Sequence, residues 1–499
     1  MKKLIFTGIL FVSVFGIYFR AIDNPLEFDS ASVASYGPMS VGDAIRSTIG
    51  TVLDYSKSGL TAYGRTLNGF SFSVLSKWGL KTQHFANIIL HFLNSILLCV
   101  FLKKLYSQRT AVFVSLFFAV NPAAIYSVCY LIERSQLLMF FFGVIQCLFY
   151  LRALQSRWWL SPVWFLASLV SYKLALISKE HSIIFIAIYP LLSLAHRENW
   201  KRSILYCSVI CGFALMLVQK IPHQIFGDLN EYYENIVTCP EILDKTNIHF
   251  RSVLTQAGLF FKYFFHWVMP VPTSIDMRVE FASSTKDIGG LVCFLVYVLG
   301  SIGLAIKKST RYLGCGLLMA ACFFLPEFSR ARDGEIFVLY RSYIYALAYM
   351  IVIGWGVERL KDKWALPAVL FIFAAVTFAR VPMFDSGSRL WTQAADLIDL
   401  SNPRLACQAP RAFNNAGGSL LQEGRTQEAI QYFKIATALA PEWGAPSSNL
   451  GVAYYFLGDF ASSKAVFSDL MKRDLPGDMS TQAKAFLQDI QRKEQSELR

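Results

Sequence analysis

The amino-acid sequence predicts an all-α polytopic membrane protein that ends in a separate helical repeat region. The chain has 499 residues, of which 55% are hydrophobic and only 16% are charged. Soluble globular chains average about 45–50% apolar and about 25% charged residues. Long apolar runs alternate with short basic clusters, and a 34-residue repeat follows them. These three observations exclude an ordinary cytosolic enzyme and a disordered chain.

The net charge of +13 comes from Lys and Arg clusters that lie between the apolar runs. Such clusters orient membrane spans, because cytoplasmic loops collect Lys and Arg. No module that combines basic and aromatic residues for nucleic-acid binding is evident in the sequence. We therefore expect the bilayer as a partner and no nucleic acid.

Eleven apolar segments approach the roughly 20 residues that a transmembrane helix needs. The first follows Met1-Lys2-Lys3 and shows no small-residue cleavage site after it, so we expect an uncleaved span with a cytoplasmic N-terminus. The predicted spans are 4–19, 84–102, 111–129, 132–151, 159–178, 182–195, 202–219, 288–306, 312–326, 343–357 and 364–379.

The basic clusters decide the predicted topology. With eleven spans, every cluster falls on the cytoplasmic side, whereas a twelfth span at 253–268 would send the last two clusters outside. We therefore interpret 253–268 as an interfacial or re-entrant helix, which is tolerated where protein shields its backbone. The regions 20–83, 220–287, 327–342 and everything after 380 are then extracytoplasmic. The region 1–380 forms the predicted membrane domain.

A repeat begins after a predicted linker at 381–409. Four positions recur after 34 residues, the period of tetratricopeptide repeats, in which a helix, a turn and a second helix form each unit. They are Asn415, Gly417, Gly424 and Phe433, which recur as Asn449, Gly451, Gly458 and Phe467. The run 477–496 predicts a further amphipathic helix that caps the stack. Because two repeats are few, we expect this domain, 410–499, to be stabilised by packing against the membrane domain.

The ten cysteines show neither metal-ligand spacing nor a dense framework, so we expect no zinc site and no disulfide scaffold. Cys239 and Cys407 lie in regions predicted to be outside. They could pair in an oxidising compartment, and the sequence leaves this open.

Ionisable and polar residues at or near membrane depth are expensive, which makes them candidates for function. Arg, Lys and His around an outward-facing cavity suit an anionic headgroup, and a nearby carboxylate suits a general base. Together they predict a transferase with a lipid-phosphate donor. The candidates are Asp29, Arg65, His84, Asn87, His91, Glu133, Arg134, Lys179, Glu180, His181, Arg332 and Arg341.

Plain structural roles compete with these interpretations. His91 equally suits helix packing. Lys179, Glu180 and His181 could form a polar turn between two spans, and Glu133 with Arg134 could be an interfacial pair.

Several stretches, in this order and spacing, resemble a family of GT-C glycosyltransferases: the transmembrane and tetratricopeptide-repeat proteins related to protein O-mannosyltransferases. The stretches are Gly64-Arg65-Thr66-Leu67 with His84-Phe85-Ala86-Asn87 and His91; Phe117 through Pro122 followed by Arg134; Ser178-Lys179-Glu180; and Leu325-Pro326 with Arg341. The sequence departs from the family pattern at Asn121, Tyr126 and Tyr340, and it has one aspartate where the family often has two.

The resemblance implies an inverting transfer of a sugar from a polyprenyl phosphate, with an acidic residue of the first outer loop as the base. We assign the base to Asp29, with Glu27 and Asp23 as alternatives. The predicted donor- and substrate-binding residues are Arg65, His84, Arg134, Lys179, Glu180, His181, Arg332 and Arg341. Because the acids that a divalent metal needs are missing, we expect no metal, and no cofactor.

The predicted location is a bacterial inner membrane, and the predicted acceptor or partner is an exported protein, for example a pilin, near the repeats. Two other classes remain open. A polysaccharide polymerase or ligase would favour a site in 220–287. A transporter or non-catalytic scaffold would not need Asp29, although a transporter should show paired halves, which the sequence lacks.

Overall fold

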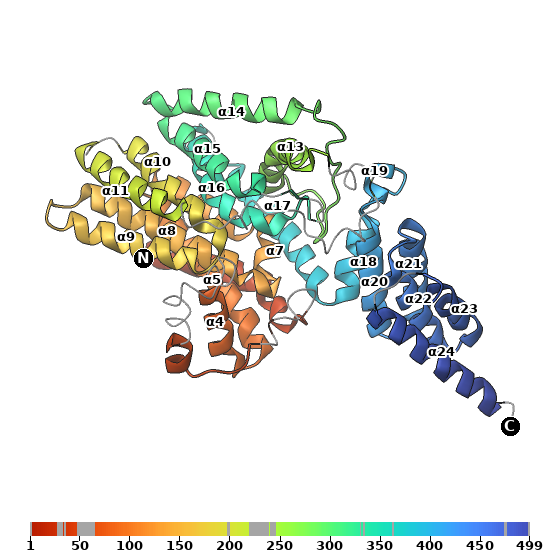
Figure 1. Ribbon diagram of the computed structural model, residues 1–499. Helices are drawn as coiled ribbons and strands as arrows, with labels where there is room; N and C mark the ends of the chain where they lie inside the picture. Colours follow the sequence, from red (N-terminus) through yellow and green to blue (C-terminus); the bar gives the residue numbers. More distant parts are fainter. Residues whose placement is uncertain are drawn as a thin grey trace.

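The computed structural model describes residues 2–26, 33, 36–46, 65–196, 200–218, 239, 246–329, 331–332, 335–361, 364–473 and 477–497. Within these ranges the chain is helical, and β structure is limited to an isolated bridge between Met277 and Phe337. The predicted class, an all-α polytopic membrane protein, is confirmed. Figure 1 shows α18–α24 on the right of the molecule, with α24 leading to the C-terminus at the lower right.

The first half of the chain forms these helices: α1 (Lys2–Tyr18), η1 (Phe19–Asp23), α4 (Thr66–Ser76), α5 (Leu80–Leu102), α6 (Gln108–Ala119), η3 (Pro122–Ala124), α7 (Ile125–Val128), η4 (Leu131–Glu133), α8 (Arg134–Gln155), α9 (Ser161–Leu176), η5 (Glu180–Ala187), α10 (Ile188–Ala195) and α11 (Trp200–Val218). The remainder of the membrane region forms α13 (Ile248–Val268), α14 (Gly289–Ile306), α15 (Arg311–Phe324), η9 (Leu325–Phe328), η10 (Leu339–Arg341), α16 (Ser342–Arg359), α17 (Leu366–Arg380) and η11 (Val381–Phe384).

Six described helices are long and apolar enough to cross a membrane, or seven if the bent pair Gln108–Ala119 and Pro122–Val128 is one span. Most described residues of each of the eleven predicted segments are helical, so the smaller number of spans follows from the length and composition of these helices. The helix Ser161–Leu176 and the segment Glu180–Ala195, which begins as a 3₁₀ turn, are shorter than 18 residues. The six spans are Leu4–Asp23, Leu80–Leu102, Leu131–Gln155, Gly289–Ile306, Arg311–Phe328 and Leu366–Phe384.

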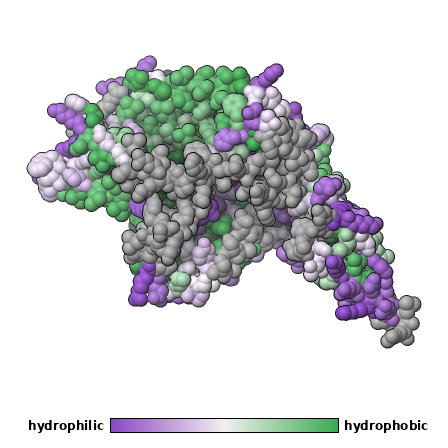
Figure 2. All heavy atoms as spheres, viewed as in Figure 1, coloured by the Kyte–Doolittle hydropathy of each residue, from purple (hydrophilic) through white to green (hydrophobic). Residues whose placement is uncertain are grey.

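Helix α14 shows how the outside of this region is built. Only 17% of its 18 residues are buried inside the protein. Figure 2 shows hydrophobic residues gathered over the top of the molecule, where α14 lies, and hydrophilic residues over much of the tail. An apolar surface of this kind suits contact with lipid rather than with water. Its exposed apolar residues are Val292, Leu295, Val296, Leu299, Ile302 and Ile306.

Helix α13 was predicted to be interfacial or re-entrant, and it is not among the six spans. It is 21 residues long and interrupts its apolar face with polar residues. Arg251, Gln256 and His266 are all buried inside the protein. Gln256 Nε2 donates to the carbonyl of Ile336 at 2.7 Å. The helix therefore carries its polar residues against protein.

The tail consists of α18 (Gly387–Asp396), α19 (Pro403–Ala406), α20 (Pro410–Gln422), α21 (Thr426–Leu439), α22 (Gly444–Leu457), α23 (Phe460–Leu470) and α24 (Gly477–Glu497). The residues that recur after 34 positions form the same glycine–phenylalanine contact in each repeat. A Cβ atom at Gly417 would lie 2.7 Å from the Phe433 ring, and one at Gly451 would lie 2.8 Å from the Phe467 ring. The glycine thus makes room for the phenylalanine of the following helix in each unit. The domain limits themselves stay a prediction.

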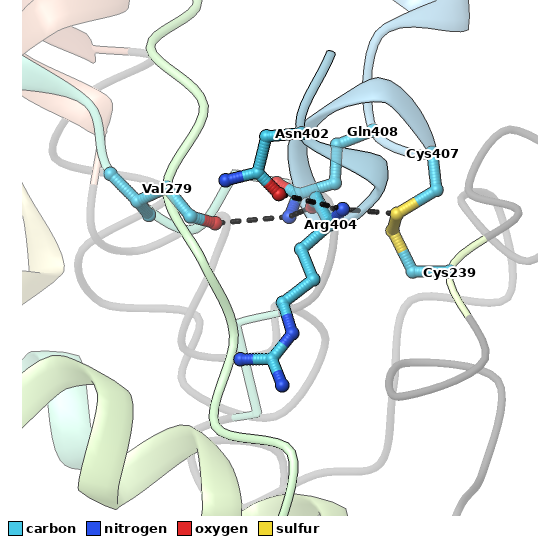
Figure 3. Close-up of a disulfide and its surroundings, with 6 residues drawn as sticks. All are labelled: Cys239, Val279, Asn402, Arg404, Cys407 and Gln408. Atoms are coloured by element: carbon cyan, nitrogen blue, oxygen red, sulfur yellow. Dashed lines mark hydrogen bonds between the residues drawn. A yellow bond between two sulfur atoms is a disulfide. The ribbon is translucent and has the colours of Figure 1, made fainter. Parts of the chain in front are cut away.

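A disulfide fastens the tail to the membrane region. Cys239 and Cys407 are bonded, which answers the question that the sequence left open. Beside it, Gln408 Nε2 donates to the Val279 carbonyl at 2.9 Å, as Figure 3 shows. Arg404 pairs with Glu280 at 3.3 Å on the exposed side of the junction. The predicted linker therefore docks on the segment that follows α13.

Candidate functional site

The predicted base, Asp29, lies outside the described residues, as does its alternative Glu27. The other alternative, Asp23, is exposed and pairs with Lys81 at 2.6 Å. The nearest described residues on either side of Asp29 approach one apolar cluster. Leu26 and Val33 both pack in the group that contains Phe72 and Leu131.

Two ion pairs lie at the start of η5, one to Glu133 of η4 and one to Arg65, which precedes α4. Lys179 Nζ is 2.9 Å from Glu133 Oε2, with side chains only 4% and 10% exposed. Arg65 Nη2 is 3.3 Å from Glu180 Oε1, and the Arg65 side chain is half exposed. Lys179 and Glu180 are adjacent at the start of η5, so the two pairs are neighbours. The polar turn that contains Lys179 and Glu180 therefore forms ion pairs with two other segments of the chain, those of Glu133 and Arg65.

A second group surrounds the fully buried Glu327 in η9, directly after α15. Its carboxylate is 3.1 Å from Arg341 Nη1 and 3.2 Å from Arg332 Nε, and it accepts a hydrogen bond from the Tyr345 hydroxyl at 3.1 Å. His181 interacts electrostatically with Glu327 as well as with Glu180. It thereby links this group to the pairs at η5.

A third group connects to the same Arg341. Glu335 Oε2 is 3.1 Å from Arg341 Nη2, and Glu335 Oε1 is 3.7 Å from Arg411 Nη1. Arg411 and Arg278 both pair with the buried Asp276, Arg411 at 3.0 Å. Burial by itself raises the pKa of the Asp276 carboxyl, but the guanidinium groups of Arg278 and Arg411 outweigh burial and hold this pKa below its usual range.

We call these three groups together the charged cluster. Tyr340 connects the first group to the third without being counted among them, because the Lys179 ammonium lies 5.8 Å from its ring centre and its hydroxyl donates to Glu335 at 3.1 Å. The cluster has six Lys or Arg residues, five carboxylates and a histidine. Its members are Arg65, Glu133, Lys179, Glu180, His181, Asp276, Arg278, Glu327, Arg332, Glu335, Arg341 and Arg411.

This arrangement gives the cluster a defined capacity. Each Lys or Arg already faces a carboxylate, so the groups are held in place before any ligand binds. An incoming phosphate would exchange with a carboxylate for the same guanidinium, which can hold either anion bidentately. Arg65 is the most exposed of these cations. It is therefore the one that a ligand reaches with least rearrangement.

Arg134 and His84 occupy a different environment. Arg134 has no exposed surface, and its guanidinium stacks 4.0 Å from the Phe72 ring centre. It donates to Asn87 Oδ1 at 2.7 Å, the Gln83 carbonyl at 2.7 Å and Ser71 Oγ at 3.2 Å. These neutral acceptors tie α8 to α4 and α5. His84 is buried on α5 near Arg134. Their predicted contact with phosphate stays a prediction.

His91 has the packing role that the sequence left as its alternative. Its Nδ1 lies 2.8 Å from the Tyr343 hydroxyl and its Nε2 lies 3.0 Å from the Ala119 carbonyl. Two positions that depart from the family pattern also make structural links. Tyr126 donates to Thr273 at 2.7 Å, and Asn121 donates to the Trp267 carbonyl at 2.9 Å. His91 joins α5 to α6 and α16, Asn121 joins the turn before η3 to α13, and Tyr126 joins α7 to the segment after α13.

Several cluster residues are not among the candidates that the sequence predicts. Glu327 and Glu335 had a usable signal, because they lie between or beside Arg332 and Arg341 in a loop that was already singled out. Asp276 and Arg278 lie in a loop assigned only to the outside. Arg411 lies at the start of the predicted repeats, and nothing in its sequence neighbourhood connects it to the other residues.

Comparison with known proteins supports the resemblance. The chain is 23% identical over 453 residues to protein O-mannosyl-transferase TMTC3 of Homo sapiens, covering 81% of this chain and 47% of that protein. It is 22% identical over 449 residues to the protein of the same name from Mus musculus, with the same coverage. The predicted resemblance is confirmed. The chain spans about half the length of these curated relatives. No family model and no solved structure matches it.

Proposed function

We propose that this protein is a membrane glycosyltransferase of GT-C type that transfers a sugar from a polyprenyl phosphate to a hydroxyl group of an exported protein. The relatives are named as protein O-mannosyl-transferases, and their similarity extends over 81% of this chain. The observation that carries the proposal is the charged cluster. It gathers six of the predicted donor- and substrate-binding residues, Arg65, Lys179, Glu180, His181, Arg332 and Arg341, beside the ends of apolar helices.

The proposed reaction is a single displacement with inversion. The acceptor oxygen bonds to the anomeric carbon while the bond from that carbon to the phosphate oxygen breaks. Asp29 takes the acceptor hydroxyl proton as general base. The lipid phosphate leaves with the electron pair of the broken bond, and nothing is oxidised or reduced. No metal and no cofactor is part of this proposal.

The cluster supplies electrostatic stabilisation in this reaction. Negative charge grows on the phosphate as the bond breaks, and preorganised cations around that charge lower the barrier. Arg65 and Arg341 are our first candidates for this contact, because one is half exposed and the other is held on two sides by Glu327 and Glu335. Ion pairs already formed in the free protein reduce the reorganisation that binding requires.

The disulfide supports an extracytoplasmic tail. Disulfides persist in oxidising compartments such as the bacterial periplasm, and Cys239 and Cys407 both lie in regions that the basic clusters assign to the outside. We therefore propose the predicted orientation, with a cytoplasmic N-terminus and an extracytoplasmic tail, in a bacterial inner membrane. The tail would then meet exported proteins such as pilins.

The test compares the masses of exported proteins in cells. The gene is deleted and then complemented with wild type, Asp29→Asn or Asp43→Asn at equal membrane levels. Asp43 is an exposed acid of the same predicted outer loop, and it contacts Ser40. We expect one exported protein to lose a sugar-sized mass on deletion, and wild type and Asp43→Asn, but not Asp29→Asn, to restore it.

Other outcomes separate the alternatives. If no exported protein changes mass while a surface polysaccharide is lost, a polymerase or ligase replaces the proposal. If Asp29→Asn restores the mass fully, the assignment of the base is wrong although the transferase remains. If deletion changes no glycan at all, a scaffold is the better account.

A further inference from the structure

One side chain of the tail reaches into the charged cluster. Arg411 is the second residue of α20, and its side chain is only 8% exposed. Its Nη2 lies 3.0 Å from Asp276 Oδ1, and its Nε donates to Asp276 Oδ2 at 3.3 Å. Its Nη1 lies 3.7 Å from Glu335 Oε1. The guanidinium therefore bridges two carboxylates of the membrane region.

Glu335 carries this contact onward to the predicted donor site. One carboxylate oxygen faces Arg411, and the other faces Arg341 Nη2 at 3.1 Å. Arg341 also donates to the Glu335 carbonyl at 3.2 Å and to Glu327 at 3.1 Å. The orientation of Arg341 thus depends on Glu335, and Glu335 lies between two guanidinium groups. If the Arg411 guanidinium is removed, the Glu335 carboxylate is attracted by Arg341 alone and can change its position.

The tail around Arg411 is fixed by two further contacts. Cys407, four residues earlier, is bonded to Cys239, and Gln408 donates to the Val279 carbonyl. The Gln408 contact holds the start of α20 against the segment that carries Asp276, and the disulfide ties the same part of the tail to Cys239. Arg411 is therefore delivered to the cluster by an anchored element.

We propose that Arg411 is a positioning residue for the donor site, and that the tail is in this way a structural part of that site. Arg411 fixes the orientation of the Glu335 carboxylate, Glu335 fixes the orientation of the Arg341 guanidinium, and Arg341 binds the lipid phosphate. The inference rests on the proposed function for this last step. The first two steps concern the protein alone and are tested without any activity.

The experiment uses the full chain in lipid nanodiscs as wild type, Arg411→Gln, Arg411→Lys and Arg404→Gln. Arg404 is the matched control, because it also joins the tail to the membrane region but in an exposed pair with Glu280. Hydrogen exchange of the backbone at 335–341 reports the coupling directly. Transfer from a polyprenyl-phosphate sugar to the acceptor protein gives kcat and the donor KM.

We expect Arg411→Gln to speed exchange at 335–341, to raise the donor KM about 10-fold and to lower kcat as well, because Arg341 would both bind the phosphate of the donor and stabilise the charge that grows on it. Arg411→Lys should restore part of both, since an ammonium keeps the charge but loses the fork that spans two carboxylates. Arg404→Gln should match wild type in both measurements.

The inference is overturned if exchange at 335–341 is the same in Arg411→Gln and Arg404→Gln. It is also overturned if exchange rises but the donor KM does not, because Arg341 would then not respond. A general loss of folding would instead speed exchange throughout the chain, without rescue by Arg411→Lys, and would leave Arg411 a merely structural residue. If wild type transfers no sugar, the proposed function fails, and exchange still decides whether Arg411 orders this segment.

Discussion

The charged cluster and the helices α20–α24 use the same residue types in opposite ways. In the tail, Lys464 and Glu494 pair with side chains 43% and 41% exposed, whereas Arg341 and Glu327 of the cluster are 8% and 2% exposed. Exposed pairs contribute about 0–1 kcal/mol to stability. Buried pairs must recover a large desolvation penalty. Apolar packing therefore stabilises the tail, while the cluster keeps expensive charges for which function is the better explanation.

The largest effect should follow from neutralising the most buried acid of the cluster. Glu327→Gln leaves Arg341 and Arg332 without their shared carboxylate. We expect the free energy of unfolding to fall by about 3–5 kcal/mol, or donor binding at Arg341 to weaken by a similar free energy. Thermal unfolding in nanodiscs and the exported-protein mass test measure the two effects.

Glu494→Gln is the control for this substitution. It removes the same charge from an exposed pair, so its unfolding midpoint should lie close to that of wild type. Equal midpoints for Glu327→Gln and Glu494→Gln, with sugar transfer intact in both, would remove the distinction between the cluster and the tail.

The tail should respond instead to the loss of apolar volume. Phe467 is fully buried, its ring stacks on Phe486 with centroids 5.1 Å apart, and it fills the space left by Gly451. Phe467→Ala should destabilise the tail by about 3 kcal/mol, at the lower end of the range for buried phenylalanines because a terminal helix can collapse onto the gap. Protease cleavage of the tail measures this.

The exposed Phe456 of the same unit provides the comparison, and Phe456→Ala should change cleavage little. If Phe467→Ala leaves cleavage unchanged, packing is not what holds these helices. If it accelerates cleavage throughout the membrane region as well, the two regions unfold together.

The disulfide tests how far the two regions depend on each other. Cys239→Ser with Cys407→Ser removes a cross-link between residues 168 apart, for which about 2 kcal/mol is a conservative expectation. We expect faster cleavage near residue 407 but retained ion pairs at Arg411. Thiol labelling of wild type under non-reducing conditions should leave this pair of its ten cysteines unlabelled. Labelling of both would show that the bond is absent in the native protein.

The two regions also differ in how well sequence predicts them. The packing of Gly417 on Phe433 and of Gly451 on Phe467 follows a fixed period, so a local pattern contains the information. The cluster has no such period. Its members come from segments between residues 65 and 411, and ion pairing in three dimensions rather than spacing connects them.

Some parts of the site were still predictable. Lys179, Glu180, Arg332 and Arg341 were expected because charges beside apolar runs stand out in one dimension. Arg134 stood out for the same reason, yet it stacks on Phe72 and binds neutral acceptors. A hydropathy pattern identifies a charged residue within an apolar run. The partner that binds this residue can be identified only from the three-dimensional structure. Arg411 was missed because its partners lie 76 and 135 residues away, a separation that no local pattern reports.

The smallest effect concerns pH. Burial by itself raises the pKa of both the Asp276 and Glu335 carboxyls, but Arg278 and Arg411 outweigh it at Asp276, and Arg341 and Arg411 do so at Glu335, so both values lie below the usual range. A carboxyl with a lowered folded-state pKa contributes stability above its unfolded value, about 4, and loses that contribution as pH falls through the folded value. Arg278, Arg341 and Arg411, the Tyr340 hydroxyl and, for Glu335, the Asp276 carboxylate act on these carboxyls, and none of these groups titrates between pH 5 and 8.

Hydrogen exchange at 335–341, corrected for the intrinsic effect of pH, should therefore stay constant from pH 8 to 5 and rise only below about pH 4. Asp276→Asn should make it fast at every pH, because the amide cannot balance Arg278 and Arg411. A transition near pH 6.5 in the wild-type chain would instead assign the control of this segment to a histidine, and His181, which interacts with Glu327, would be the residue to substitute next. The buried junction between tail and membrane region would then be a pH-responsive contact rather than a permanent one.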